Sequence, residues 1–158
     1  IGEPPEFETR PGVVDWENRL TTIVSGVAEG HLVGGNLSLM VTLLGTPFEP
    51  QFEGAILFLE DVGEPPYSVD RMLTHLWMAG KLEQLAGIVL GKFTDDGYDR
   101  NTFSMEEVLR NRLEPLGIPT LRGAMIGHVE DKTVVPLGVR ARLDADAGAL
   151  TLLESAVS

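Results

Sequence analysis

Residues 54–91 read GAILFLEDVGEPPYSVDRMLTHLWMAGKLEQLAGIVLG and hold two short apolar runs with a helix-like segment between them. The runs AILFL (55–59) and GIVLG (87–91) are continuous rather than alternating, which is typical of strands that are covered on both faces. From Ser68 to Gly80, apolar residues recur at helical spacing. Two buried strands joined by a helix indicate a βαβ-like unit, and such units build α/β folds.

The residues before this unit predict strands and a short helix. Residues 21–35 alternate apolar with small or polar residues, and we expect two short strands broken at Gly30. Asn36 then caps a short buried helix that ends at Gly45. Residues 1–20 contain three prolines and two glycines without a sustained apolar period, so we interpret them as a linker or an edge segment.

The residues after the unit add a helix, a strand and a hairpin. Ser104 and the glutamate three residues later have the pattern of a capping box, which predicts a helix over 104–117. Residues 118–128 predict a strand that ends in His128, and residues 139–154 predict a hairpin. The fold class that we expect is therefore α/β, with a mixed sheet and about three helices.

The composition is that of a globular domain and excludes several function classes. Of 158 residues, 43% are hydrophobic, which suffices for an ordinary core, and we place Trp77 and the methionines in it. The net charge of −12 disfavours nucleic acid and anionic membrane surfaces as partners. The longest apolar run, 55–59, is far shorter than the roughly 20 residues that span a bilayer. Without cysteine, disulfides, thiolate metal sites and a cysteine nucleophile are excluded.

The acidic and imidazole groups at predicted strand ends are the candidates for chemistry. Ligands of open α/β sheets bind outside the carboxyl ends of the strands. Glu60 and Asp61 end one predicted strand, and His128 ends another. If these ends adjoin, a carboxylate that accepts the Nδ1–H of His128 would fix the tautomer and stabilise the imidazolium, as in a nucleophilic triad.

Other interpretations of these residues stay open. Glu60, Asp61, Glu64 and His128 could instead ligate a metal ion, although their spacing matches no HExxH-like pattern. They could equally have structural roles, such as ion pairs or a helix cap. Asn36 is a candidate for substrate binding, because the Gly-Gly-Asn turn would let a ligand approach the backbone, although a tight turn explains these residues as well.

Three blocks of the sequence resemble the C-terminal domain of the LD-carboxypeptidases, also called muramoyltetrapeptide carboxypeptidases. They are GHLVGGNLSLMVTLLGTPFEP (30–50), the run from AILFLED to GIVLGKF (55–93) and GHVEDKTVVPLGVRARLD (127–144), in the order that the family shows. The resemblance extends from about residue 28 to residue 153 and implies that residues 21–158 form this domain, with its swivelling β/β/α-like fold. Microcin C self-immunity peptidases belong to the same superfamily and are the nearest functional alternative.

The resemblance implies a Ser–Glu–His triad. In the family, this triad hydrolyses the bond between the L-centre of a diamino acid and a terminal D-Ala in murein tetrapeptides, during cytoplasmic recycling of peptidoglycan. Glu60 is similar to the family's triad acid and His128 to its general base, and no metal or other cofactor is needed. The nucleophilic serine belongs to an N-terminal domain that this chain lacks. Ser38 is no substitute, because it falls inside the predicted short helix rather than at a strand-to-helix elbow.

The expected partners are therefore a murein tetrapeptide and the N-terminal serine domain, and neither nucleic acid nor a membrane is expected. Because the chain begins with Ile1 rather than Met, we expect a processed or truncated piece of a longer protein. Since the nucleophile of the triad is missing, we expect this piece to turn over nothing by itself. A free-standing binding module that keeps the fold without the chemistry is the alternative. An apolar surface left by the absent domain would favour a homodimer.

Overall fold

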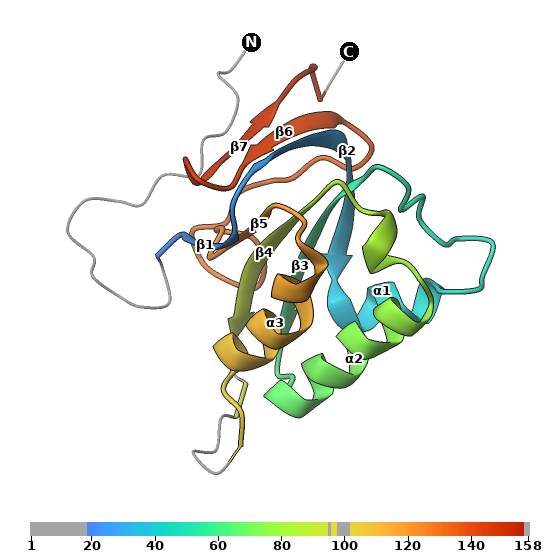
Figure 1. Ribbon diagram of the computed structural model, residues 1–158, viewed down its shortest axis with the longest axis vertical. Helices are drawn as coiled ribbons and strands as arrows, with labels where there is room; N and C mark the ends of the chain where they lie inside the picture. Colours follow the sequence, from blue (N-terminus) through green and yellow to red (C-terminus); the bar gives the residue numbers. More distant parts are fainter. Residues whose placement is uncertain (1–18, 95, 98–101, 157–158) are drawn as a thin grey trace.

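The computed structural model describes residues 19–94, 96–97 and 102–156, and it contains a seven-stranded mixed sheet with α-helices on one face (Figure 1). The strand order is β1-β5-β4-β3-β2-β6-β7. The expected α/β class, mixed sheet and three helices are confirmed in this part of the chain, whereas residues 1–18 of the predicted linker lie outside it. The elements are β1 (Thr21–Val24), β2 (Val27–Asn36), α1 (Leu37–Leu43), β3 (Ile56–Val62), α2 (Pro66–Met78), the 3₁₀ turn η2 (Leu82–Gln84), β4 (Gly87–Thr94), α3 (Met105–Leu113), the 3₁₀ turn η3 (Glu114–Leu116), β5 (Thr120–Arg122), β6 (Arg140–Asp144) and β7 (Ala149–Leu152).

β3, α2 and β4 form the predicted βαβ unit at the centre of the sheet. β3 and β4 pair in parallel, and β2 and β5 flank them, also in parallel. α2 begins at Pro66, before the predicted start at Ser68, because the first turn of a helix tolerates a proline, whose nitrogen has no hydrogen to donate. The carboxyl ends of these four strands lie at one edge of the sheet, which we call the carboxyl edge.

β2 is one long strand that belongs to two parts of the sheet. Its residues 32–36 pair in parallel with β3, whereas residues 27–31 pair antiparallel with β6, so that the sheet curls (Figure 1). The predicted break at Gly30 is therefore wrong, and the chain turns earlier, at Gly26. A Cβ built on Gly30 would lie 2.3 Å from the carbonyl oxygen of Gly54. Glycine at position 30 thus allows a close backbone approach rather than a break.

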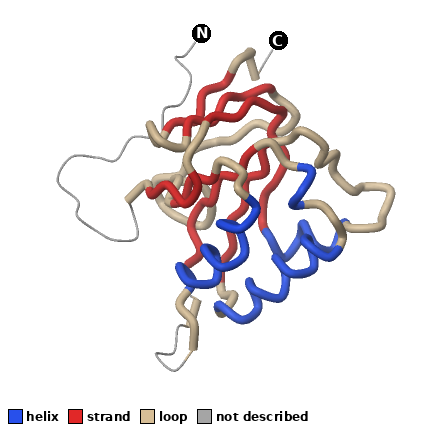
Figure 2. Tube along the Cα trace, in the orientation of Figure 1, coloured by secondary structure: helices blue, strands red, loops and turns tan. Residues whose placement is uncertain are grey.

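Apolar side chains pack on both faces of the sheet, because alternate residues of a strand point to opposite sides. Leu57 and Leu59 of β3 lie in the core beneath the three helices. Ile56 and Phe58 lie in a second core on the other face, together with Ile126 and residues of the β6–β7 hairpin. Figure 2 shows this arrangement, with the helices gathered on one side of the strands. The continuous apolar run of β3 therefore reflects burial on both faces, as expected.

The two apolar side chains that end α2 are exposed, and for them the expected core position is wrong. Trp77 is 51% exposed and Met78 is 75% exposed. The buried stripe of α2 faces the sheet through residues such as Met72 and Leu76. At 3.6 residues per turn, Trp77 lies at the margin of this stripe and Met78 lies on the opposite side.

The predicted strand over 118–128 is wrong in its second half, because β5 is only three residues long. Gly123, with φ 96°, turns the chain out of the sheet. Residues 123–139 are irregular, and we call them the 123–139 loop. Ile126 anchors this loop, since its side chain is 5% exposed in the core opposite the helices. His128 consequently lies in a loop and not at a strand end.

Two local predictions are confirmed. The Ser104 side chain accepts a hydrogen bond from the Glu107 N–H, and the Glu107 carboxylate accepts one from the Ser104 N–H, which completes the capping box of α3. The bonds from the backbone and hydroxyl of Ser104 lower the pKa of Glu107 below its usual value. β6 and β7 form the predicted hairpin, paired antiparallel.

We expect Gly30→Ala to lower the free energy of unfolding by about 1–3 kcal/mol, because the new methyl group would push β2 away from the backbone at Gly54. Urea denaturation measures this change. Glu29→Ala, at the exposed neighbouring position, is the control and should change stability by less than about 0.5 kcal/mol. A Gly30→Ala protein as stable as the unaltered one would contradict the close contact.

Candidate active site

Glu60 and His128 meet at the carboxyl edge of the sheet. The Nδ1 atom of His128 lies 2.9 Å from Oε2 of Glu60, although 68 positions separate the two residues in the chain. The proximity that the sequence suggested is therefore present. β3 has a register irregularity between Leu59 and Asp61, and Glu60 lies within it. Such irregularities redirect side chains, and they are frequent beside active sites.

The two side chains of the pair differ in their access to solvent. The Glu60 side chain is 8% exposed, whereas that of His128 is 56% exposed. A neutral imidazole that donates its Nδ1–H to the carboxylate keeps Nε2 as its basic nitrogen. The buried carboxylate can stabilise the imidazolium when Nε2 takes up a proton. A pair with this geometry can act as a general base with its orienting acid, and the imidazole is open to solvent on one side.

Asp61 has a different neighbourhood from Glu60 and anchors the start of α1. It is 3% exposed. Its carboxylate accepts hydrogen bonds from the backbone N–H of Ser38 at 2.9 Å, from the Ser38 hydroxyl at 2.8 Å and from Nδ2 of Asn36 at 2.8 Å. These bonds join the end of β3 to the turn between β2 and α1. Asp61 is therefore a structural anchor of the carboxyl edge.

Asn36 is the N-cap of α1, as expected, because its side-chain oxygen accepts a hydrogen bond from the Leu39 N–H at 3.1 Å. It pairs with Glu60 in the register between β2 and β3, which places it next to the Glu60–His128 pair. Both ends of its amide are engaged, since Nδ2 donates to Asp61. Its proposed contact with substrate stays a prediction.

The four side chains considered as metal ligands do not converge. Glu60 faces His128, Asp61 faces α1, and Glu64 accepts a hydrogen bond from Ser68 in the first turn of α2. Among the residues that the structure describes, no three His, Asp or Glu side chains are placed to hold one metal ion. The geometry therefore favours the acid–base interpretation of Glu60 and His128.

Lys92 contributes to this edge, although the sequence analysis did not single it out. It follows the buried run of β4 and is 6% exposed. Its backbone N–H donates to the carbonyl oxygen of Ile126 at 2.9 Å and so fixes the 123–139 loop just before His128. A lysine placed directly after an apolar run was the only signal in the sequence.

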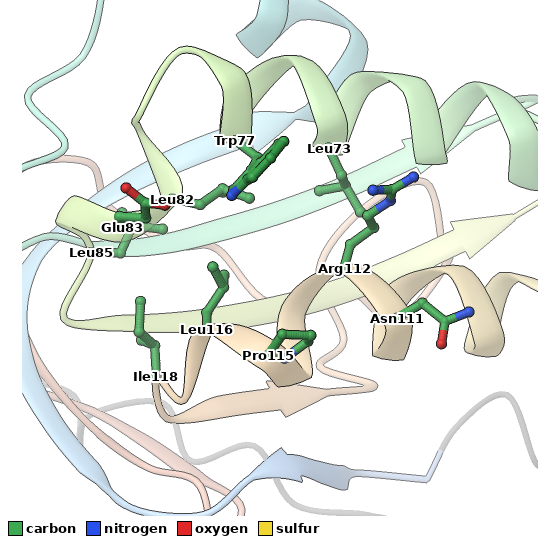
Figure 3. Close-up of a pocket in the computed structure, with 10 residues that line it drawn as sticks. All are labelled: Leu73, Trp77, Leu82, Glu83, Leu85, Asn111, Arg112, Pro115, Leu116 and Ile118. Carbon is green, nitrogen blue, oxygen red and sulfur yellow. The ribbon is translucent and has the colours of Figure 1, made fainter.

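A cavity of about 520 Å³ lies elsewhere, between α2, η2 and the end of α3. Figure 3 shows the Trp77 indole and the Arg112 guanidinium on either side of it, with Leu116 below. Asp70 hydrogen-bonds with Arg112 and raises the pKa of that guanidinium. Because α2 runs away from the carboxyl edge, this cavity is at the opposite end of the domain from Glu60. The Glu60–His128 pair therefore does not lie in this cavity.

Comparison with known proteins identifies a family. Residues 29–143 match the model of the LD-carboxypeptidase C-terminal domain. A probable murein peptide carboxypeptidase of Bacillus subtilis (strain 168) is 44% identical over 141 residues, which are 88% of this chain and 44% of that protein. The microcin C7 self-immunity protein MccF of Escherichia coli is 29% identical over 147 residues, which are 90% of this chain and 42% of that protein. The crystal structure of muramoyltetrapeptide carboxypeptidase from Oxalobacter formigenes is 37% identical with a TM-score of 0.74, and the match covers 84% of this chain and 49% of that one.

The chain belongs to the LD-carboxypeptidase family, of which it contains the C-terminal domain. The resemblance drawn from the three sequence blocks is confirmed. The chain spans somewhat less than half the length of the relatives that it matches. None of the helices in the described ranges combines the length and the hydropathy that a bilayer span requires.

We expect Asp61→Ala to lower the free energy of unfolding by about 1–3 kcal/mol, because donors on Asn36 and Ser38 would lose their acceptor. Ser38→Ala is the matched variant and should cost about 1 kcal/mol or less, since it removes one hydroxyl and leaves the backbone bond intact. Urea denaturation compares the two. Equal losses would show that the carboxylate does not anchor the turn.

Proposed function

We propose that this chain is the C-terminal catalytic half of a serine LD-carboxypeptidase that removes the terminal D-Ala from murein tetrapeptides. In this proposal Glu60 and His128 are two members of a Ser–Glu–His triad, and the protein acts in the cytoplasm during peptidoglycan recycling. The observation that carries the proposal is the 2.9 Å contact between His128 Nδ1 and a buried Glu60 carboxylate. A carboxylate in that position holds the imidazole in the tautomer that a general base needs.

The nucleophile in this proposal is a serine outside the present sequence, on an N-terminal domain. Support comes from the relatives, which are more than twice as long as the part that this chain matches. Ser38 is unsuited to the role, because its hydroxyl donates to Asp61 and its residue lies in the first turn of α1. The open side of His128, with 56% of its side chain exposed, leaves room for the second domain.

The reaction follows from this arrangement. His128 Nε2 takes the proton of the serine hydroxyl while the serine oxygen attacks the carbonyl carbon of the peptide bond before D-Ala. The protonated imidazole, stabilised by Glu60, then gives this proton to the leaving amine, and the C–N bond breaks. Water attacks the resulting ester with His128 again as base, which releases the shortened peptide and restores the serine.

A second candidate is a peptidase resembling the microcin C7 self-immunity protein. The observation that favours it is the match to that protein over 90% of this chain, at 29% identity. Both candidates use the same general base, so the choice between them depends on the substrate, and the relative with 44% identity favours a murein peptide. A binding module without chemistry is disfavoured, because it would not need the Glu60–His128 contact. Homodimer formation stays a prediction.

In the complete protein, we expect His128→Ala and Glu60→Gln to reduce kcat for D-Ala release by about 10⁴-fold or more, because the serine loses its base or the base loses its orientation. Release of D-Ala from murein tetrapeptide is the measurement, and circular dichroism checks folding. His75→Ala is the matched control, since this imidazole is exposed on α2 and is not part of the pair. A fully active His128→Ala variant would end the assignment.

A further inference from the structure

The segment that carries His128 lies directly on the ends of β3 and β4. Two glycines allow this approach. A Cβ built on Gly91 of β4 would lie 2.4 Å from the carbonyl oxygen of Ile126. A Cβ built on Gly127 would lie 2.8 Å from Oε2 of Glu60 and 3.1 Å from its Cβ. Nonbonded contacts of a Cβ under 3.0 Å are essentially absent from real structures, so a methyl group would displace the Ile126 backbone if placed at Gly91 and the Glu60 carboxylate if placed at Gly127.

Oε2 of Glu60, for which Gly127 leaves room, is also the atom that holds the imidazole of His128. Oε2 of Glu60 is the acceptor for Nδ1 of His128. The carboxylate is therefore confined on one side by the Gly127 backbone and on another by the imidazole. The Glu60 side chain is also buried, with 8% of it exposed, so solvent does not compete strongly for this carboxylate.

We propose that Gly127 is a positioning residue for the Glu60–His128 pair: the missing side chain at this position lets the carboxylate lie against the backbone and so sets its distance from His128 Nδ1. Its effect on catalysis rests on the function proposed above. Its effect on the pair itself does not, because the pair exists in this chain. Gly91 supports the same segment from β4 by letting the Ile126 carbonyl come close.

Gly127 also has φ 123°, a conformation that side chains rarely adopt, so backbone strain has to be separated from contact with Glu60. Gly138 supplies a control for a positive φ within the same 123–139 loop. Its φ is 77°, and a Cβ built there would meet nothing within 4 Å. Gly138→Ala therefore brings the strain of a left-handed alanine without touching Glu60.

The test is the tautomer of His128 in this chain, read by ¹⁵N NMR at alkaline pH, where the ring is neutral. The unaltered protein and Gly138→Ala should show the Nδ1–H form held by Glu60. Gly127→Ala should lose this preference. A Gly127→Ala protein that keeps the tautomer of the unaltered protein would overturn the proposal and leave the proposed function standing.

A stability cycle keeps the proposal testable if Gly127→Ala folds poorly. In a Glu60→Ala background two of the three Glu60 atoms that oppose the new methyl group, Oε2 and Cγ, are gone and only Cβ, at 3.1 Å, remains, so Gly127→Ala should lower the urea midpoint clearly less than it does in the unaltered protein. The proposal would be overturned if Gly127→Ala lowered the urea midpoint as much in the Glu60→Ala background as in the unaltered protein. It would also be overturned if the double variant stayed unfolded while Gly138→Ala folded.

In the complete protein, Gly127→Ala should lower kcat about 10²-fold with little change in KM, because misplacement of a catalytic group by about 1 Å costs on that order. Gly138→Ala should stay within a few-fold of the unaltered enzyme. If Gly127→Ala loses the His128 tautomer and yet keeps full kcat, the positioning role stands and the proposed function is contradicted.

Discussion

The hydrogen bond between His128 and Glu60 is the constraint on which the site depends, because it joins two segments 68 positions apart in the chain. Each part of the fold contributes to it. The parallel strands bring the end of β3 to the carboxyl edge, and the irregularity of β3 turns Glu60 toward the 123–139 loop. Ile126 fixes that loop to the sheet by its side chain and by its carbonyl bond to β4. The two faces of the sheet are thus covered differently, with the helices on one and Ile126 of the 123–139 loop packed on the other.

Neighbouring carboxylates at this edge have unlike roles because of where they point. Asp61 accepts hydrogen bonds from α1 and its cap and therefore stabilises the scaffold. Glu60 has the His128 imidazole as its partner, and the proposed function rests on this contact. The His128 ring is half-exposed, whereas the Glu60 carboxylate beside it is buried. This difference is expected if a second surface covers the ring and completes the site. The relatives that the chain matches are about twice as long as this chain, and in the proposed function their other half supplies this surface.

Much of the centre of the fold could be predicted from the sequence, because local patterns determine it. The apolar run of β3, the helix after it and the capping box at Ser104 each depend on neighbouring residues, and each is confirmed. The position of Glu60 at a strand end followed from the same run. The family resemblance supplied the roles proposed for the pair, and the 2.9 Å contact between the two side chains supports them.

The parts that could not be predicted depend on contacts between distant segments. Gly30 looked like a break, but it makes room for the Gly54 carbonyl. His128 looked like the end of a strand, yet the chain leaves the sheet at Gly123, and burial of Ile126 gave the loop a strand-like pattern. Trp77 was placed in the core because of its type, whereas its angular position on α2 decides its exposure.

The central claim is that Glu60 and His128 act on a nucleophile supplied from outside this sequence. Incubation of murein tetrapeptide with this chain alone, and with the chain plus a separately produced N-terminal half of the complete protein, tests it most directly. The account predicts no release of D-Ala by the chain alone and release when both halves are present. Release by the chain alone would contradict it, and release that survives Glu60→Gln together with His128→Ala would place the active site elsewhere.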